Sequence, residues 1–191
     1  MIPLDRNTVA ITVALLWLIW AAYWTVNAFG NKRSVYKQSL KSRLLYLAAA
    51  IVVFTMIRNS GTSRIPIFRE TISTQITGLA MCAAGIALAI HARRILGSNW
   101  SGLITLKENH ELIRNGPYRF VRHPIYSGLI LAVAGTVIAT NPTALGLCVF
   151  ALVAIGLKLK SLGEEKILIP QFPESYPQYK REVKSLIPFV W

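Results

Sequence analysis

The sequence predicts an all-α integral membrane protein with about five transmembrane helices. Two observations lead to this prediction. Hydrophobic residues make up 53% of the 191 residues and charged residues make up 15%, which is less charge than a soluble domain of this size carries. The apolar residues also gather in long runs that basic segments separate, as membrane helices and their connections do.

Five apolar runs define the predicted helices. The first is 22 residues long and uncharged, enough to cross a hydrocarbon core of about 30 Å at about 1.5 Å per residue. Gly78 and Gly85 in the third run predict close packing against another helix. Asn141-Pro142 separates the last two runs and predicts a tight hairpin, after which we expect a polar tail. The runs cover residues 8–29, 44–57, 71–90, 126–140 and 143–157, and the tail covers residues 158–191.

Basic residues predict the orientation of these helices. Of the 21 Lys and Arg residues, 17 follow the first, third and fifth runs, and 4 lie at the N-terminus or in the other connections. This asymmetry predicts an outside N-terminus, with the central loop and the C-terminus in the cytoplasm. The net charge is +13, but nucleic acid is not expected as a partner because no basic stretch lies outside the membrane frame. Cys82 and Cys148 both fall in apolar runs, which predicts buried hydrophobic side chains rather than a disulfide or a metal pair.

The central loop ends in a rigid, basic and aromatic stretch, residues 116–128 with the sequence GPYRFVRHPIYSG. Such a loop is suited to hold a charged small molecule beside a lipid. Pro124 favours the first turn of the next helix, so we expect His123 at the positive end of a helix dipole, where an anion binds well. A simple helix cap explains His123 equally well. Arg119 and Arg122, near the bilayer boundary, are more readily explained as lipid anchors.

The predicted tail contains the acidic counterpart of this loop. Lys160 and Glu164 are four residues apart and share one helix face, and Glu164-Glu165 is the only adjacent acidic pair in the sequence. A helical salt bridge is the simpler explanation. The hairpin, however, should bring the acidic pair to the basic loop at one cytoplasmic mouth, where the two would suit a zwitterionic ligand with an extra positive charge. An amphipathic helix, acting in membrane packing or as a lid, is predicted from the spacing of Phe172, Tyr176, Tyr179, Val183, Leu186 and Ile187.

From about Trp100 to Pro188 the sequence resembles the isoprenylcysteine carboxyl methyltransferase family and its bacterial membrane methyltransferase relatives. Before Trp100 it matches only as hydrophobic helices. The matching elements are His110-Glu111-Leu112-Ile113, Gly116-Pro117-Tyr118-Arg119, Arg122-His123-Pro124-Ile125-Tyr126-Ser127-Gly128, the Asn141-Pro142 turn, Glu164-Glu165, the segment from Phe172 to Tyr179, and Leu186-Ile187-Pro188.

The resemblance implies S-adenosylmethionine as cofactor, and Lys160 and Glu164 as catalytic residues. Lys160 stands where the family commonly has an arginine that contacts the substrate carboxylate, so the charge is kept and the bidentate fork is lost. Leu103 also departs from the family, because it replaces a polar cofactor contact of eukaryotic members. No metal is implied. The cofactor contacts would fall on His110, Glu111, Leu112, Ile113, Tyr118, His123, Pro124, Ile125, Tyr126 and Glu164.

The expected reaction is methylation of the carboxylate of an isoprenylcysteine-like acceptor, a lipophilic or prenylated substrate that enters from the bilayer. Residues 1–191 would form a single methyltransferase domain, with a three-span frame in 1–90 and the cofactor-binding half in 91–191. The resemblance places it in the prokaryotic inner membrane, among membrane lipids, with its oligomeric state open. Three alternatives are an amine or phospholipid N-methyltransferase, for which His123 is a possible base, a sterol-reductase-like nicotinamide enzyme, and a non-catalytic scaffold.

Overall fold

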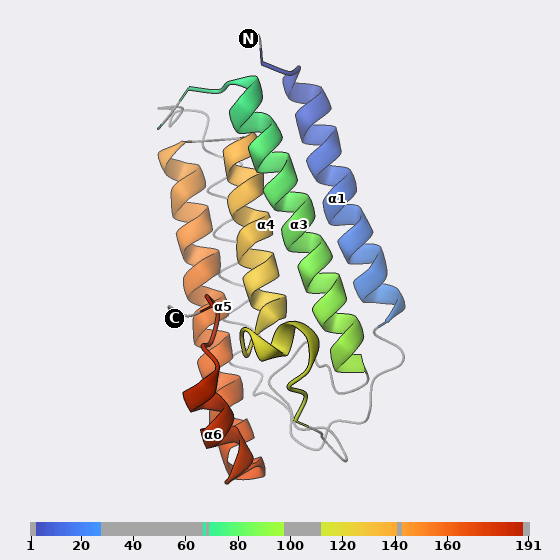
Figure 1. The fold of residues 1–191 in the computed structure, drawn as a ribbon. Helices are drawn as coiled ribbons and strands as arrows, with labels where there is room; N and C mark the ends of the chain where they lie inside the picture. Colours follow the sequence, from blue (N-terminus) through green and yellow to red (C-terminus); the bar gives the residue numbers. More distant parts are fainter. Residues whose placement is uncertain (1–2, 28–66, 68, 98–111, 141–142, 189–191) are drawn as a thin grey trace, which may run out of the picture.

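The part of the chain that the structure describes is a bundle of four long helices with two short helices at one end (Figure 1). The computed structural model describes residues 3–27, 67, 69–97, 112–140 and 143–188, and every structural statement below concerns these residues. The long helices are α1 (Arg6–Val26), α3 (Ile72–Leu96), α4 (Pro124–Thr140) and α5 (Ala144–Gln171). The short ones are the 3-10 helix η2 (Gly116–Arg119) and α6 (Ser175–Glu182).

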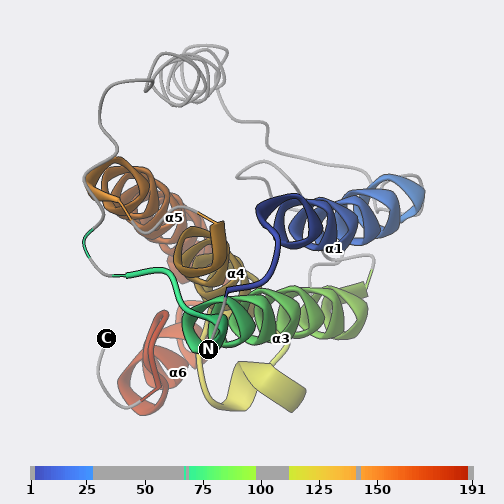
Figure 2. The ribbon, with the colours of Figure 1, turned by 90° about the horizontal axis from the view of Figure 1, so that it is seen from above.

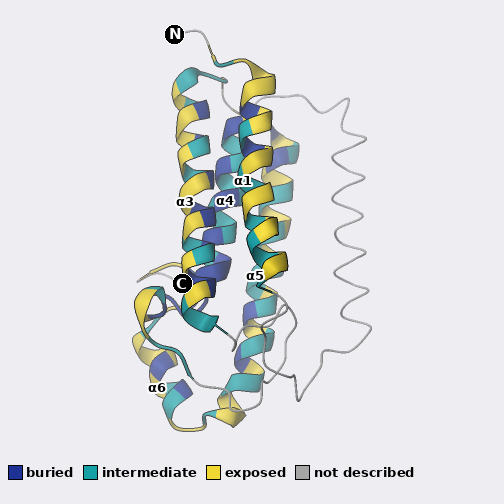
Figure 3. Ribbon diagram, turned by 90° about the vertical axis from the view of Figure 1, so that its right-hand side faces the viewer, coloured by how far each residue is buried: buried dark blue, intermediate teal, exposed yellow. Residues whose placement is uncertain are grey.

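The predicted class, an all-α integral membrane protein, is confirmed within the described residues. Three helices there, α1, α3 and α5, are long and apolar enough to cross a membrane, and α4 is a shorter apolar helix of 17 residues. Four of the five predicted spans are found with shifted ends, whereas the run 44–57 lies outside the described residues. Exposed residues line the outer faces of α1 and α3, as helices in contact with lipid require (Figure 3).

Helix α4 lies at the centre of the bundle, between α1, α3 and α5 (Figure 2). Its contact with α3 is so close that backbone meets backbone. A Cβ on Gly85 would lie 2.4 Å from the carbonyl oxygen of Gly128, and a Cβ on Gly135 would lie 2.4 Å from the amide nitrogen of Cys82. Small residues permit this approach, which confirms the packing role expected of Gly78 and Gly85.

Helix α5 is longer than predicted. The fifth run was expected to end at residue 157, but the helix continues through 28 residues to Gln171. Its length of about 42 Å exceeds the hydrocarbon core by about 12 Å. The polar tail expected from residue 158 is thus helical as far as Gln171, because a change from apolar to charged residues marks the membrane boundary and does not by itself end a helix.

The C-terminal segment also differs from the prediction. The amphipathic helix expected over residues 172–187 is helical only over Ser175–Glu182, with Pro177 in its first turn. After α6 the chain is extended and runs parallel to the loop before α4, with a bridge between Val121 and Lys184. Arg122 N donates to Lys184 O at 2.8 Å and His123 N to Ser185 O at 3.0 Å. These long-range bonds satisfy the backbone of the segment in place of helical ones.

Candidate functional site

Three segments far apart in the sequence meet at the end of the bundle that carries α6 (Figure 1). They are the loop between η2 and α4, the last turns of α5, and the extended chain after α6. Tyr126 lies on the first turn of α4, so it faces the same junction. The hairpin of α4 and α5 thus brings the acidic pair to the basic loop, as expected from the sequence.

Glu165 pairs with three basic side chains at this junction. Glu165 as a whole is 2% exposed. Its Oε1 atom accepts hydrogen bonds from Arg122 Nη2 at 2.6 Å and from Arg122 Nε at 3.1 Å. His123 Nε2 lies 3.3 Å from the same oxygen. Lys180 Nζ forms an ion pair with the other oxygen, Oε2, at 2.9 Å. A buried carboxylate is tolerated only when it is paired in this way.

Glu164, the neighbouring carboxylate, has a different environment. The hydroxyl of Tyr126 donates to Glu164 Oε1 at 2.5 Å, and His123 Nδ1 lies 3.4 Å from Glu164 Oε2. The side chain of Glu164 is 22% exposed, against 3% for Glu165. Glu164 is therefore the carboxylate of the pair that a ligand can reach.

His123 lies between the two carboxylates, with one ring nitrogen facing each. Burial lowers the pKa of His123, but hydrogen bonds to Glu164 and Glu165 and their negative charge outweigh burial, so the pKa is raised. The ring also stacks on Tyr126, with the planes 5° apart. The geometry does not support the expected anion site at His123, since its backbone N–H bonds Ser185 and its ring faces two anions.

Arg122 is not the lipid anchor that we expected. Its side chain is 6% exposed, and besides Glu165 it donates to the carbonyl oxygens of Lys180, at 3.2 Å, and of Val183. Arg122 thus ties the C-terminal segment to α5. Arg119 is exposed, and its guanidinium carbon lies 4.9 Å from the centroid of the Phe120 ring.

Lys160, which is half-buried, lies against the buried ring of Tyr126. Lys160 Nζ lies 5.4 Å from the centroid of the Tyr126 ring, which places a cation over an electron-rich face. Tyr126 therefore contacts an ammonium with its ring and a carboxylate with its hydroxyl. Lys160 and Glu164, the two residues that the resemblance implies are catalytic, thus both contact Tyr126.

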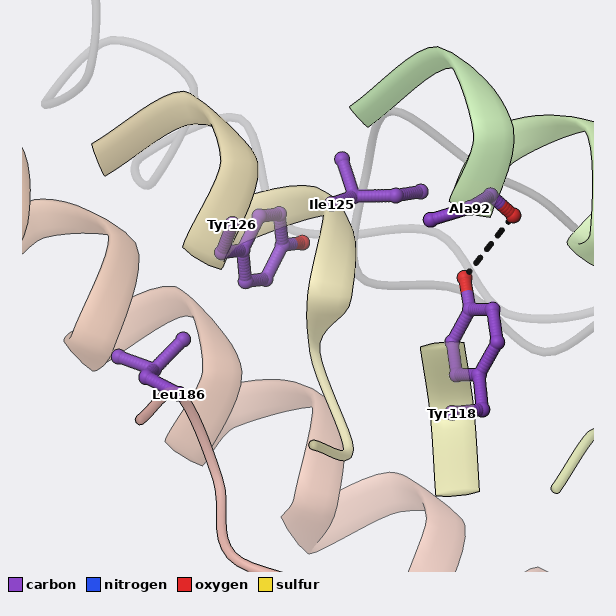
Figure 4. Packing of buried hydrophobic residues seen from close by; sticks show 5 residues of the cluster. All are labelled: Ala92, Tyr118, Ile125, Tyr126 and Leu186. Carbon is purple, nitrogen blue, oxygen red and sulfur yellow. Dashed lines mark hydrogen bonds between the residues drawn. The ribbon is translucent and has the colours of Figure 1, made fainter. Parts of the chain in front are cut away.

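Of the remaining predicted site residues that the structure describes, some are buried and others are half-buried. Tyr118 is 6% exposed, and its hydroxyl lies under the end of α3 and donates to Ala92 O at 3.4 Å (Figure 4). Pro124 and Ile125 are buried at the start of α4, and Leu112 and Ile113 are half-buried, Ile113 against the cluster of Tyr118, Tyr126 and Leu186. His110 and Glu111 lie outside the described residues.

Sequence reasoning did not assign three residues that the structure brings into the site: Arg122, Glu165 and Lys180. A signal existed for the first two, since Arg122 adjoins His123 and Glu165 adjoins Glu164. An arginine beside an apolar run ordinarily contacts lipid, so the sequence did not predict the ion pair of Arg122 with Glu165. For Lys180 nothing local distinguished it from other basic residues of α6.

Comparisons with known proteins identify the family. The family model for isoprenylcysteine carboxyl methyltransferases matches residues 78–170. A probable protein-S-isoprenylcysteine O-methyltransferase from Oryza sativa subsp. indica is 30% identical over 173 residues, which is 88% of each chain. The chain belongs to the isoprenylcysteine carboxyl methyltransferase family. The matched region includes the loop, α4 and Glu164-Glu165, and ends before α6.

Two further similarities extend this result. The protein-S-isoprenylcysteine O-methyltransferase of Xenopus laevis is 31% identical over 176 residues, which cover 87% of this chain and 59% of that protein. The fold is similar to that of the eukaryotic intramembrane Ras methyltransferase, an isoprenylcysteine carboxyl methyltransferase, with a TM-score of 0.60 at 23% identity. That likeness covers 82% of this chain and 55% of the solved one, so this chain spans about half of the larger protein.

Proposed function

We propose that this protein transfers a methyl group from S-adenosylmethionine to the carboxylate of an isoprenylcysteine-like acceptor held in the membrane. Membership of a methyltransferase family requires a methyl donor. The observation that carries the proposal is the junction of Tyr126, Lys160 and Glu164 at the end of the α4–α5 hairpin.

The side chains at this junction fit the proposed donor. S-adenosylmethionine supplies a methyl group on a positively charged sulfur. Glu164 is a partly exposed carboxylate, and the Tyr126 ring already lies against one ammonium, that of Lys160. A carboxylate beside an aromatic face is a favourable environment for the cationic groups of such a ligand. Glu164, oriented by the Tyr126 hydroxyl, would hold it, with Leu112 and Ile113 supplying apolar contact.

The surroundings of His123 favour a carboxylate acceptor over an amine. An amine must lose a proton before it attacks, so the enzyme needs a base. Both nitrogens of His123 face carboxylates and its pKa is raised, which makes the ring a proton donor to its neighbours. A carboxylate acceptor is already ionised and needs only alignment and desolvation. Lys160 would position it by charge.

The proposal includes a location and an orientation. The apolar helices make this an integral membrane protein, and we place it in a prokaryotic inner membrane as one methyltransferase domain over residues 1–191. The N-terminus would lie outside and the α6 end in the cytoplasm. The start of α1 and α6 lie at opposite ends of the bundle (Figure 1), which suits this orientation. The acceptor's lipid would then enter from the bilayer.

Calorimetric titration of the detergent-solubilised protein with S-adenosylmethionine tests the donor. We expect saturable binding in the wild type and an affinity about ten- to hundredfold lower for Glu164→Gln, because charge-assisted hydrogen bonds are lost. Glu174→Gln makes the same chemical change on an exposed carboxylate of the chain and should bind normally. Equal binding by a folded Glu164→Gln would contradict the assignment of Glu164.

The acceptor is tested with the methyl-labelled donor and two lipids, an S-farnesylated N-acetylcysteine and phosphatidylethanolamine. A carboxyl methyl ester releases methanol in mild alkali, whereas a methylated amine does not. We expect alkali-labile label on the farnesylated cysteine. Alkali-stable label on the phospholipid would replace the proposed reaction by amine methylation.

A further inference from the structure

Glu165 joins three separate segments through one buried carboxylate. Arg122 and His123 come from the loop before α4, Lys180 comes from α6, and Glu165 itself comes from α5. The distances of 2.6 Å to Arg122 Nη2, 3.3 Å to His123 Nε2 and 2.9 Å to Lys180 Nζ make it the centre of the cluster. With its side chain 3% exposed, Glu165 lies behind Glu164, which faces the proposed cofactor.

His123 connects the buried carboxylate to the reachable one. Its Nε2 atom faces Glu165 and its Nδ1 atom faces Glu164. A ring held at both nitrogens has a fixed orientation, and Tyr126, stacked on that ring, donates to the same Glu164. The position of Glu165 is therefore transmitted to Glu164 through His123. A second hydrogen bond on the far nitrogen commonly orients a functional histidine in this way.

We propose that Glu165 is a positioning residue for the cofactor site, which acts through His123 on Glu164 and through Arg122 and Lys180 on the C-terminal segment. The proposal rests on the proposed function, since it concerns the same site. Glu165 would touch neither the donor nor the acceptor. Its two effects are to hold the His123 ring in place and to keep the chain after α6 docked against α5.

The charges around His123 make the proposal testable by titration. Glu164 and Glu165 face the ring from α5, Tyr126 stacks on it from α4, Arg122 precedes it in the loop, and Lys180 of α6 reaches it through Glu165. Loss of the Glu165 charge should lower the pKa of His123, because a hydrogen bond and a negative charge that favour the protonated ring are removed. Loss of the Lys180 charge should raise it, because the nearby carboxylate is then less neutralised.

The experiment compares Glu165→Gln and Lys180→Met with the wild type and with Lys166→Met, a control at an exposed position of α5. His123 is one of three histidines in the chain, so its ring carbon–proton signal can be followed by NMR from pH 5 to 9. The signal is assigned by its loss in His123→Asn. The affinity for S-adenosylmethionine is measured on the same samples by calorimetry.

We expect opposite shifts of the His123 pKa in Glu165→Gln and Lys180→Met, and an affinity about tenfold lower in Glu165→Gln, as for residues coupled in one network. Lys166→Met should behave as the wild type. If Glu165→Gln does not fold, Lys180→Met, whose lysine side chain is 45% exposed, must still raise the pKa of His123, and an unchanged pKa overturns the proposal. A merely structural role for Glu165 would lower the stability of Glu165→Gln but leave the affinity of its folded form for S-adenosylmethionine unchanged.

The outcomes separate this proposal from the proposed function. A folded wild type that binds no S-adenosylmethionine overturns the proposed function. A wild type that binds, together with a folded Glu165→Gln of equal affinity or unchanged His123 pKa, overturns only the positioning role of Glu165.

Discussion

The adjacent carboxylates of Glu164 and Glu165 on α5 have different environments, because successive residues of an α-helix point about 100° apart. Glu165 points into the junction and is enclosed by Arg122, His123 and Lys180. Glu164 points toward Tyr126 and stays partly exposed. Because they occupy neighbouring positions on α5, Glu165 is buried at the centre of the ion pairs, whereas Glu164 remains accessible to a ligand.

The raised pKa of His123 predicts how stability depends on pH. A group with a folded pKa above its unfolded value of about 6.5 stabilises the fold fully below that value, and the contribution is lost as pH rises through the folded pKa. We expect the wild type's advantage over His123→Gln in thermal unfolding to shrink from pH 6 to pH 9. Burial raises the pKa of Tyr179 to about 12 and that of Tyr118 further, so these groups do not titrate in this window. An advantage that grows with pH would contradict the raised pKa of His123.

At the scale of elements, the contact between α3 and α4 predicts a strong sensitivity to side-chain size. An added methyl at Gly85 would meet backbone atoms of Gly128 and Ala132 at 2.4 and 2.5 Å, and backbone cannot give way as a flexible side chain can. Gly85→Ala should lose about 1–3 kcal/mol of stability, the usual cost of overpacking. Gly156→Ala is the matched control, since a Cβ there meets no described residue within 4 Å. Thermal unfolding in detergent should separate the two, and equal midpoints would contradict the close approach.

The extended chain after α6 is held by one buried leucine as well as by hydrogen bonds. Leu186 is 2% exposed and packs with Tyr118 and Tyr126, while its carbonyl oxygen accepts from Ser127 Oγ at 2.5 Å. Leu186→Ala should weaken docking of this segment by about 2–5 kcal/mol. Limited trypsin digestion should then cut faster at Lys184. Ile187→Ala, at a 48% exposed neighbour, should leave the rate unchanged, and similar rates for both variants would exclude Leu186 as the anchor.

At the scale of the whole molecule, the sequence predicted the class and the meeting of loop and acidic pair, because both follow from local patterns. Long apolar runs indicate membrane-spanning helices directly. A helical hairpin brings its first and last residues together, however its turn is built. The end of α5 at Gln171 could not be predicted from its apolar run, which stops at residue 157, because a helix can continue through charged residues outside the membrane. The pairing of Val121 with Lys184 joins residues too distant for any periodicity to show.

The proposed orientation predicts which end of the bundle a membrane-impermeant reagent reaches. In a background with Cys82→Ala and Cys148→Ala, the variant Lys184→Cys should react with an impermeant maleimide only in inside-out vesicles. Asn7→Cys, at an exposed position beside the start of α1, should react only in right-side-out vesicles. The reverse pattern would place the α6 end outside and contradict the orientation.

The parallel pairing of the last described residues with the loop before α4 has a consequence for biosynthesis. Arg122 binds the carbonyl of Val183 and Ser127 that of Leu186, across 61 and 59 residues of chain. A ribosome adds about 5–20 residues per second, so the helices can enter the membrane seconds before these partners exist. A nascent chain should therefore be inserted in the membrane before residues 183–186 have been made and can dock against the loop.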